Sequence, residues 1–255
     1  MTDRKQAVEG RTARRTTRRT AANAISDGVR LRAAKVFETL RETYGEHRWR
    51  SKGTPLDELI GTVLSQHTTN VNTARSFRSL RERFPTWEAV RDAPEDDVID
   101  AIRSGGLATI KGPRIQAILR SISGRYDRLS LDRIEGMPIK DAKADLTALH
   151  GVGPKTAACV LLFSLGRPVM PVDTHVHRVS RRIGLVPPTT SAEATEPLLE
   201  ELLGPNSDRI LTAHLNLIQH GQTVCLARRP RCEACPVQSE CDYYKASPAQ
   251  DRAHR

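Results

Sequence analysis

A lysine and an aspartate in one short segment are the residues best suited to covalent chemistry. Lys155 follows the hairpin Gly151-Val152-Gly153, and Asp173 stands eighteen residues after it. The two glycines allow a tight turn and a close approach of another molecule, and the free N–H groups of the following helix can bind a phosphate. An amine next to a phosphate site indicates chemistry on a nucleic-acid backbone. Asp173 can transfer a proton or stabilise developing positive charge.

Both residues also have simpler interpretations. Lys155 can serve only as a phosphate contact, and Asp173 can serve only as the N-cap of a helix that begins at Thr174. Covalent catalysis needs a neutral amine, and both the positive end of a helix and partial burial disfavour the ammonium form. We favour catalysis because the two residues occur together and beside a second motif, a run of cysteines.

Four of the five cysteines fall in one short run with the spacing C-x6-C-x2-C-x5-C: Cys225, Cys232, Cys235 and Cys241. Because no secretion signal is evident, metal thiolates are favoured over disulfides. Structural zinc sites usually separate two ligand pairs by a dozen or more residues, whereas a cubic iron–sulfur cluster accepts ligands from one wrapped loop. The spacing therefore favours the cluster, with zinc as the alternative.

The charge of the chain indicates a polyanionic partner, with nucleic acid as the default. The formal net charge is +10 and the pI is about 9.8. Arg228, Arg229 and Arg231 lie between the first two cysteines, where they suit phosphate contact or offset thiolate charge. Residues 1–25 form a basic tail that we expect to be disordered. The sequence has no apolar run long enough to span a membrane.

Helices must position these residues, because apolar residues recur at helical rather than alternating spacing, as from Val29 to Leu40. We predict an all-α protein of about ten helices. Thr54 and the proline after it predict the start of one buried helix. The other predicted helices cover 70–83, 95–103, 112–123, 141–149, 154–165, 174–183, 191–203 and 207–221, with interruptions at Gly105-Gly106, Gly112-Pro113 and Pro187-Pro188.

The segments that carry a family resemblance are the cysteine run, Leu149-His150-Gly151-Val152-Gly153-Pro154-Lys155-Thr156 and Val172-Asp173-Thr174-His175. They resemble the helix-hairpin-helix DNA glycosylases of the HhH-GPD superfamily, and most of all the endonuclease III branch. The likeness runs from about residue 30 to about residue 245. It implies that Lys155 attacks the sugar of a damaged nucleotide, that Asp173 assists, and that the cysteines hold a 4Fe-4S cluster.

The resemblance also implies a two-lobed fold that spacing alone does not show. A six-helix barrel with the helix-hairpin-helix uses residues 47–167, an iron–sulfur cluster lobe uses 26–46 and 168–245, and a tail covers 246–255. We expect the catalytic cleft between the lobes, with Lys155 and Asp173 on opposite walls. To the connection at 124–140 we assign no function.

An enzyme that flips a nucleotide out of a duplex must fill the hole and hold the orphaned partner base. In the family, a glutamine after Leu-Ser and a leucine after a glycine do this from two loops. Leu107 matches the leucine wedge, whereas His67 occupies the glutamine's position, with Gln66 just before it. We expect this departure to alter opposite-base preference or weaken lesion recognition. The simpler interpretations are a tucked apolar loop residue and a histidine bound to helix-end carbonyls.

The resemblance therefore implies a bifunctional DNA glycosylase and abasic-site lyase that removes oxidised pyrimidines in base excision repair, by way of an imine on Lys155 and β-elimination. One alternative is a monofunctional glycosylase or abasic-site lyase of the same superfamily; the adenine-specific branch is disfavoured because it lacks a lysine at position 155. A non-catalytic DNA-binding protein is the alternative of another class. We expect a monomer in the bacterial cytoplasm, associated with the nucleoid, whose partner is double-stranded DNA containing damaged bases or abasic sites.

Overall fold

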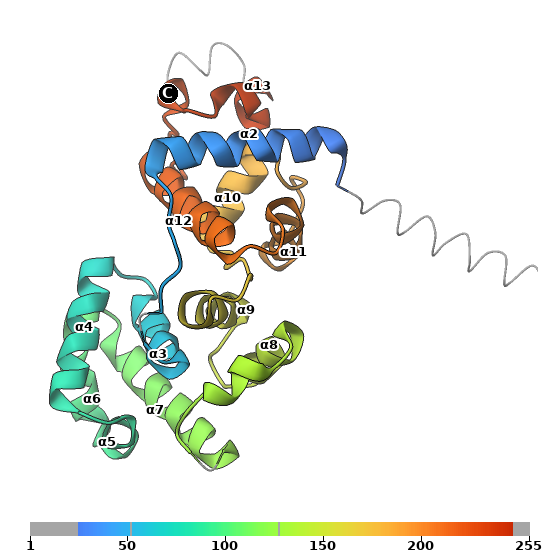
Figure 1. The fold of residues 1–255 in the computed structure, drawn as a ribbon. Coiled ribbons are helices and arrows are strands. Elements are labelled where there is room, and N and C mark those ends of the chain that lie inside the picture. The colour runs from blue at the N-terminus through green and yellow to red at the C-terminus, as the bar shows by residue number, and fades with distance from the viewer. Residues whose placement is uncertain (1–24, 52, 127, 247–255) are drawn as a thin grey trace, which may run out of the picture.

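A computed structural model describes residues 25–51, 53–126 and 128–246. These residues contain twelve α-helices and no strand, which confirms the all-α prediction (Figure 1). None of the described helices combines the length and apolar character that crossing a membrane requires. The predicted basic tail, apart from Ile25, and the C-terminal tail after Ala246 lie outside the described residues.

The helices are α2 (Asp27–Tyr44), α3 (Pro55–Ser65), α4 (Asn70–Arg83), α5 (Trp87–Asp92), α6 (Glu95–Ala101), α7 (Ala108–Arg125), α8 (Ile139–Thr147), α9 (Pro154–Cys159), α10 (Thr174–Ile183), α11 (Ala192–Leu203), α12 (Ser207–Thr223) and α13 (Asp242–Ala246). Short 3-10 turns occur at η1 (Arg103–Gly105), η2 (Asp132–Gly136), η4 (Cys232–Ala234) and η5 (Gln238–Glu240), and η3 (Val160–Ser164) is a π-helical turn.

Local side chains explain where several helices begin. The Thr54 hydroxyl accepts from the Asp57 N–H at 3.1 Å, and the Asp57 carboxylate accepts from the Thr54 N–H at 3.0 Å. This reciprocal capping box satisfies two N–H groups that have no partner inside α3. Thr69 and Ser191 cap α4 and α11 through their hydroxyl oxygens. The predicted helices at 70–83 and 174–183 are found with the same bounds.

A first hydrophobic core is built around α3. Leu59, Ile60 and Val63 of α3 are fully buried, and Ile115 and Ile118 of α7 pack in the same core. Residues of α4, α5, α6, α8 and α9 complete it. Leu131 and Ile134, two residues of the connection at 124–140 to which we assigned no function, are also fully buried there, so these two residues contribute to the core.

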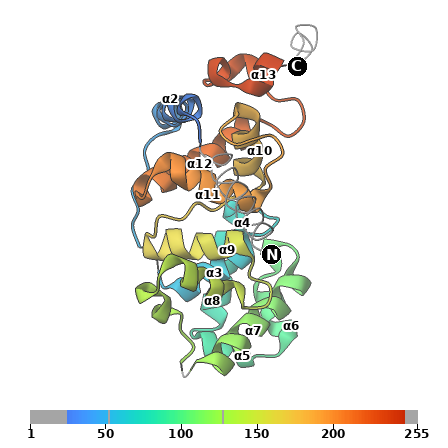
Figure 2. The same cartoon turned by 90° about the vertical axis from the view of Figure 1, so that its right-hand side faces the viewer.

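A second hydrophobic core joins α2 to the C-terminal helices. It contains Val36 of α2, Val176 of α10, Leu199 of α11 and Leu217 of α12, all fully buried. Figures 1 and 2 show α2 and α10–α13 gathered at one end of the molecule and α5–α8 at the other, with α9 between them. We propose that these two cores are the centres of the two predicted lobes.

The helix formed by α9 and η3 connects the two cores. Val160 and Leu161 pack in the first core, whereas Leu162 packs in the second. The wider π turn allows consecutive side chains to serve both cores, and such turns are frequent at functional sites. The helix that begins beside Lys155 therefore lies where the two cores meet.

One predicted interruption was wrong, and two short helices were missed. Gly112-Pro113 lies inside α7, although Pro113 removes a helical hydrogen bond. Packing holds the helix together there: a Cβ on Gly112 would lie only 2.9 Å from Cγ1 of Ile99. Helices α5 and α13 are six and five residues long, too short to show a clear apolar period.

Candidate active site and cysteine cluster

The predicted hairpin forms the connection between α8 and α9. The Val152 N–H donates to the Leu149 carbonyl at 3.1 Å, and Gly151 has a φ of +83°, which favours glycine. Gly153 is the N-cap of α9 and Pro154 its first residue. Lys155 therefore stands half-buried in the first turn of α9, where N–H groups without helical partners point away from the helix.

Asp173 is the N-cap of α10. Its Oδ1 accepts a hydrogen bond from the Val176 N–H at 2.8 Å. The capping role that we gave as the simpler interpretation is thus present, and it fixes the carboxylate at the start of the helix. A capping bond to one oxygen does not prevent an additional role in catalysis.

A cleft of about 1030 Å³ reaches Lys155. Its walls come from α3, α4, α9, η3 and α12, and they include Glu58, Cys159, Phe163 and His214. The cleft therefore draws residues from both halves of the molecule. Lys155 lines it, whereas Asp173, which we expected on the opposite wall, is not among its lining residues.

His214 on α12 is the buried polar group that the sequence did not reveal. It is 2% exposed, and its Nδ1–H donates to the Pro171 carbonyl at 2.9 Å. Burial lowers the pKa of His214 to about 4; the Asp173 carboxylate opposes this shift and the Lys155 ammonium adds to it. The imidazole is therefore neutral at physiological pH. A single histidine within a helical apolar pattern gave no signal that it would lie in the cleft.

The thiol of Cys159 is affected by the same two charged residues, Lys155 and Asp173. Burial raises the pKa of its thiol to about 11, while Lys155 lowers that pKa and Asp173 raises it. The charges of Lys155 and Asp173 thus act on the same two buried groups, Cys159 and His214. This places the two predicted catalytic residues in one electrostatic environment, although their catalytic roles stay a prediction.

The two predicted nucleotide-contacting loops carry unusual backbone conformations. Three non-glycine residues of the described chain have positive φ: His67 at 53°, Leu107 at 51° and Arg229 at 51°. All three belong to the set predicted to contact DNA. Leu107 is 48% exposed, so it does not fit the simpler interpretation of a tucked apolar loop residue. His67 is exposed, and its role stays a prediction. Such conformations cost energy and cluster at functional sites.

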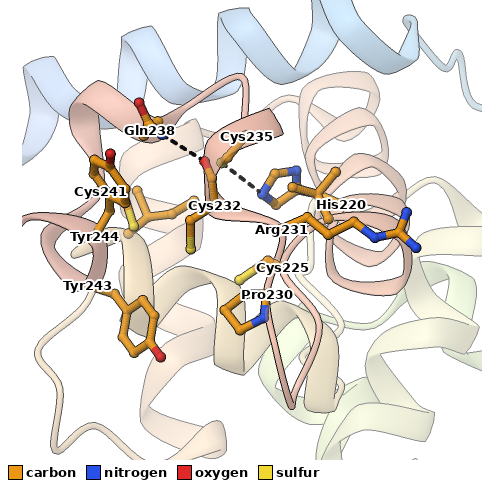
Figure 3. A pocket seen from close by; sticks show the side chains of 12 residues that line it. His220, Cys225, Pro230, Arg231, Cys232, Cys235, Gln238, Cys241, Tyr243 and Tyr244 are labelled. Carbon is orange, nitrogen blue, oxygen red and sulfur yellow. Dashed lines mark hydrogen bonds between the residues drawn. The ribbon is translucent and has the colours of Figure 1, made fainter. Parts of the chain in front are cut away.

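The four clustered cysteines line one small cavity in the second core (Figure 3). None of the four forms a disulfide, and Cys232 and Cys235 lie on or beside η4. Burial raises the pKa of the Cys235 thiol to about 11, so a thiolate there needs a compensating cation. No three His, Cys, Asp or Glu side chains in the described residues are grouped as a single-ion site. An iron–sulfur cluster does not require several ligands around one ion, because each thiolate binds a separate iron.

Arg182 donates a hydrogen bond to one cysteine sulfur, and His220 lies within hydrogen-bond distance of another. Arg182 lies with Nη1 3.5 Å from the Cys225 Sγ. His220 lies with Nε2 3.6 Å from the Cys235 Sγ (Figure 3). The Tyr44 hydroxyl lies 2.9 Å from the other ring nitrogen of His220. Donors of this kind stabilise thiolate charge and fit the residues to a thiolate-bound group.

Arginines of α10 connect the candidate active site to the cysteine loop. Arg178 donates to the Gly221 carbonyl at 2.8 Å and to the Cys225 carbonyl at 3.0 Å, and Arg182 donates to the Leu226 carbonyl at 2.7 Å. The helix that Asp173 caps is therefore bound directly to the start of the cysteine loop. The next arginines in the loop, Arg228, Arg229 and Arg231, are exposed.

Comparison with known proteins identifies the family. Residues 60–205 match the HhH-GPD superfamily of base excision DNA repair proteins. The chain belongs to this superfamily. Residues 225–241 match the iron–sulfur binding domain of endonuclease III, so the four clustered cysteines form that domain in this member of the superfamily.

Individual relatives agree with this assignment. Endonuclease III of Thermotoga maritima is 33% identical over 195 residues, 75% of this chain and 84% of the relative, and endonuclease III of Rickettsia felis is 36% identical over 189 residues, 74% and 83%. A protein of Arabidopsis thaliana described as a DNA glycosylase is 40% identical over 158 residues, 62% of this chain. The match covers 52% of that plant protein, about half of its length.

Solved structures share the fold. A non-covalent endonuclease III–DNA complex superposes with a TM-score of 0.73 at 25% identity and covers 91% of this chain and 100% of its own. A trapped endonuclease III–DNA covalent intermediate gives a TM-score of 0.71 at 26% identity, covering 87% and 98%. These matches confirm the resemblance to endonuclease III and the fold of the helix-hairpin-helix glycosylases.

Proposed function

We propose that the protein is a bifunctional DNA glycosylase and abasic-site lyase that removes oxidised pyrimidines from duplex DNA. Lys155 supports this proposal most strongly: it stands in the first turn of α9 and lines the cleft where the two cores meet. Family membership supports glycosylase chemistry, and the trapped covalent endonuclease III–DNA structure shows that a relative forms a bond to DNA.

The proposed reaction assigns one step to each residue. The neutral Lys155 amine attacks the anomeric carbon of the flipped nucleotide, and the bond to the base breaks with its electron pair leaving on the base. Asp173 accepts a proton from the amine and stabilises the positive charge on the sugar. The bond between the anomeric carbon and the ring oxygen then breaks, which gives an imine on Lys155. Removal of a proton from the sugar carbon next to the imine expels the 3′ phosphate and nicks the strand.

The proposed DNA contacts come from four segments. The hairpin at Gly151–Gly153 and exposed Arg228, Arg229 and Arg231 suit phosphates, and Leu107 suits insertion into the gap left by the flipped base. The loop at Gln66 and His67 suits the orphaned base. Three of these four segments contain the non-glycine residues with positive φ, which supports a shared binding role.

We further propose that the iron–sulfur group is a 4Fe-4S cluster held by Cys225, Cys232, Cys235 and Cys241. Four thiolates from one loop around one cavity supply one ligand for each iron of a cubic cluster. The group would hold the two ends of the loop together beside Arg182 of α10 and His220 of α12, and so support the exposed arginines structurally. Iron and sulfide analysis of the purified protein should give about four of each per chain.

Borohydride trapping tests the proposed catalysis. The wild-type protein, mixed with a duplex containing an abasic site, should give a covalent adduct, and Lys155→Gln should give none, because an amide cannot form the imine. Lys140→Gln, which changes an exposed lysine of α8, is the matched control and should trap as the wild type does. Equal trapping by wild type and Lys155→Gln would refute the role of this amine.

A second assay separates the alternatives. Single-turnover reactions on thymine glycol duplexes and on abasic duplexes distinguish base release from strand nicking. The bifunctional proposal expects both on the first substrate. Base release without nicking would indicate a monofunctional glycosylase, nicking only at abasic sites would indicate a lyase, and tight binding with neither would indicate a non-catalytic DNA-binding protein.

A further inference from the structure

One face of α7 contacts both loops that flank the proposed DNA site. Lys111 donates from Nζ to the carbonyl oxygens of Leu64 at 2.7 Å and Gly105 at 3.1 Å. Arg114, three residues later on the same face, donates from Nη1 to the side-chain oxygen of Gln66 at 2.9 Å. The end of α3, the turn before Leu107 and the Gln66 side chain are thus all bound to one helix.

We propose that Arg114 is a positioning residue that sets opposite-base selectivity. It holds Gln66 against α7, and this makes His67 the side chain presented to the orphaned base. The inference rests on the proposed function, since it concerns the base left behind when a nucleotide is flipped. Arg114 itself acts only through Gln66 and His67 and does not touch the orphaned base.

The conformations of Gln66 and His67 support this division of roles. Gln66 is half-buried, with φ −62° and ψ 127°, and its amide oxygen accepts from Arg114. His67 has a φ of 53° and is exposed. A histidine in the left-handed region needs surroundings that hold it there. The bond on the preceding residue is such a constraint, because it fixes the chain on one side of His67.

Arg114 also contacts the hairpin. A Cβ built on Gly151 would lie 3.1 Å from Cδ and 3.2 Å from Cγ of Arg114, closer than ordinary contact, so the aliphatic part of Arg114 lies directly against the hairpin backbone. One side chain therefore touches the proposed phosphate site and the loop proposed to contact the orphaned base. Its charged end makes the bond to Gln66, and such bonds are stronger than those between neutral groups.

Lys111 holds the end of α3 and the turn before Leu107 against α7. It is 2% exposed, and burial lowers the pKa of its amine. The carbonyl of Leu64 lies in the last turn of α3, where carbonyls lack helical partners, so Lys111 satisfies it. Because this side chain lies in the first core, its replacement would disturb folding. Arg114, which is half-buried, is the better residue to vary.

The test measures binding to four duplexes that contain a tetrahydrofuran abasic analogue opposite A, C, G or T. The variants are Arg114→Met, which keeps the aliphatic contact with the hairpin, His67→Ala and the double variant. Arg120→Met removes an exposed arginine from the same helix and controls for the lost charge. Arg114→Lys keeps a charged donor, and melting temperatures show that each variant is folded.

We expect the affinity of the wild type for the duplexes with its best and worst orphaned base to differ by about tenfold, which corresponds to the free energy of one good hydrogen bond. Arg114→Met and His67→Ala should each remove most of this difference in affinity, and the double variant should remove no more than either single variant. Arg114→Lys should retain the difference. Arg120→Met should change the affinity for all four duplexes by the same factor, because Arg120 donates to the Arg91 carbonyl and contacts neither Gln66 nor His67.

Three results would overturn the inference. They are a uniform loss for Arg114→Met that matches Arg120→Met, undiminished selectivity in His67→Ala, and equal affinity of the wild type for the four duplexes. Binding to the analogue requires neither base release nor an imine. Failure of the borohydride experiment with preserved selectivity would therefore refute the proposed catalysis and leave this inference intact.

Discussion

Burial of His214 predicts a pH-dependent contribution to stability that can be measured directly. The side chain is 2% exposed and burial lowers its pKa from 6.5 to about 4, against the opposing effect of Asp173. Each tenfold change in proton affinity is worth about 1.4 kcal/mol, so the preference of the fold for the neutral imidazole is worth about 3 kcal/mol. The variant His214→Gln removes this titration and keeps a hydrogen-bonding side chain.

The sign follows from the two proton affinities of His214. In the unfolded chain the imidazole binds a proton as the pH falls below 6.5, whereas in the folded chain it does so only near pH 4. The contribution is therefore complete above pH 6.5 and is lost as the pH falls toward 4. Of the total, about 2 kcal/mol should be lost between pH 6.5 and about pH 5.

Urea unfolding of the iron-loaded protein, followed by tryptophan fluorescence, gives the measurement. Trp87 packs in the first core and Trp49 against the second, so the signal reports on both. The free energy of unfolding of wild type should fall by about 2 kcal/mol more than that of His214→Gln between pH 6.5 and about pH 5. His150→Gln, at an exposed position, is the control. If the free energy of unfolding depends on pH in the same way in wild type and His214→Gln, burial of His214 does not contribute as we propose.

Three further predictions concern packing and the cysteine cluster. Glu196→Gln should lower the free energy of unfolding by about 2 kcal/mol in urea titrations, because it removes the ion-pair partner of the half-buried Lys143 and leaves Glu200 as the remaining carboxylate that acts on this amine; an unchanged free energy would contradict this. Gly166→Ala should cost about 2 kcal/mol or more, since φ is +60° and the new Cβ would lie 2.8 Å from Cδ2 of Trp49; an unchanged melting temperature would contradict it. Cys235→Ser should lose most bound iron and visible absorption and melt at a lower temperature, and full iron content would count against a ligand role.

The sequence predicted those features that depend on residues close together in the chain. The Gly151–Gly153 hairpin, the cap at Asp173 and the bounds of α4 and α10 follow from turn and cap chemistry within four or five residues. The run of cysteines indicated a metal-binding loop for the same reason. The family resemblance extended these motifs to a fold, and the comparisons confirmed it.

The sequence did not indicate which side chains from distant segments would meet. His214 lies in the cleft with Lys155, although 59 residues separate them, and nothing in the pattern around His214 signalled this. The bond from Arg114 to Gln66 spans 48 residues. The continuation of α7 through Gly112-Pro113 is another such case, because contact with Ile99 supports the helix where local propensity opposes it.

By itself, the sequence determined an all-helical chain with a lysine after a glycine hairpin and a four-cysteine loop, since caps, turns and apolar spacing act over short distances. Only the tertiary structure decided how these parts face one another. Burial, and with it the pKa values of His214 and Cys159, depends on the packing of two cores against a shared helix. The same packing made His67 and Leu107 exposed residues with left-handed backbones, because the contacts that hold such conformations come from other helices.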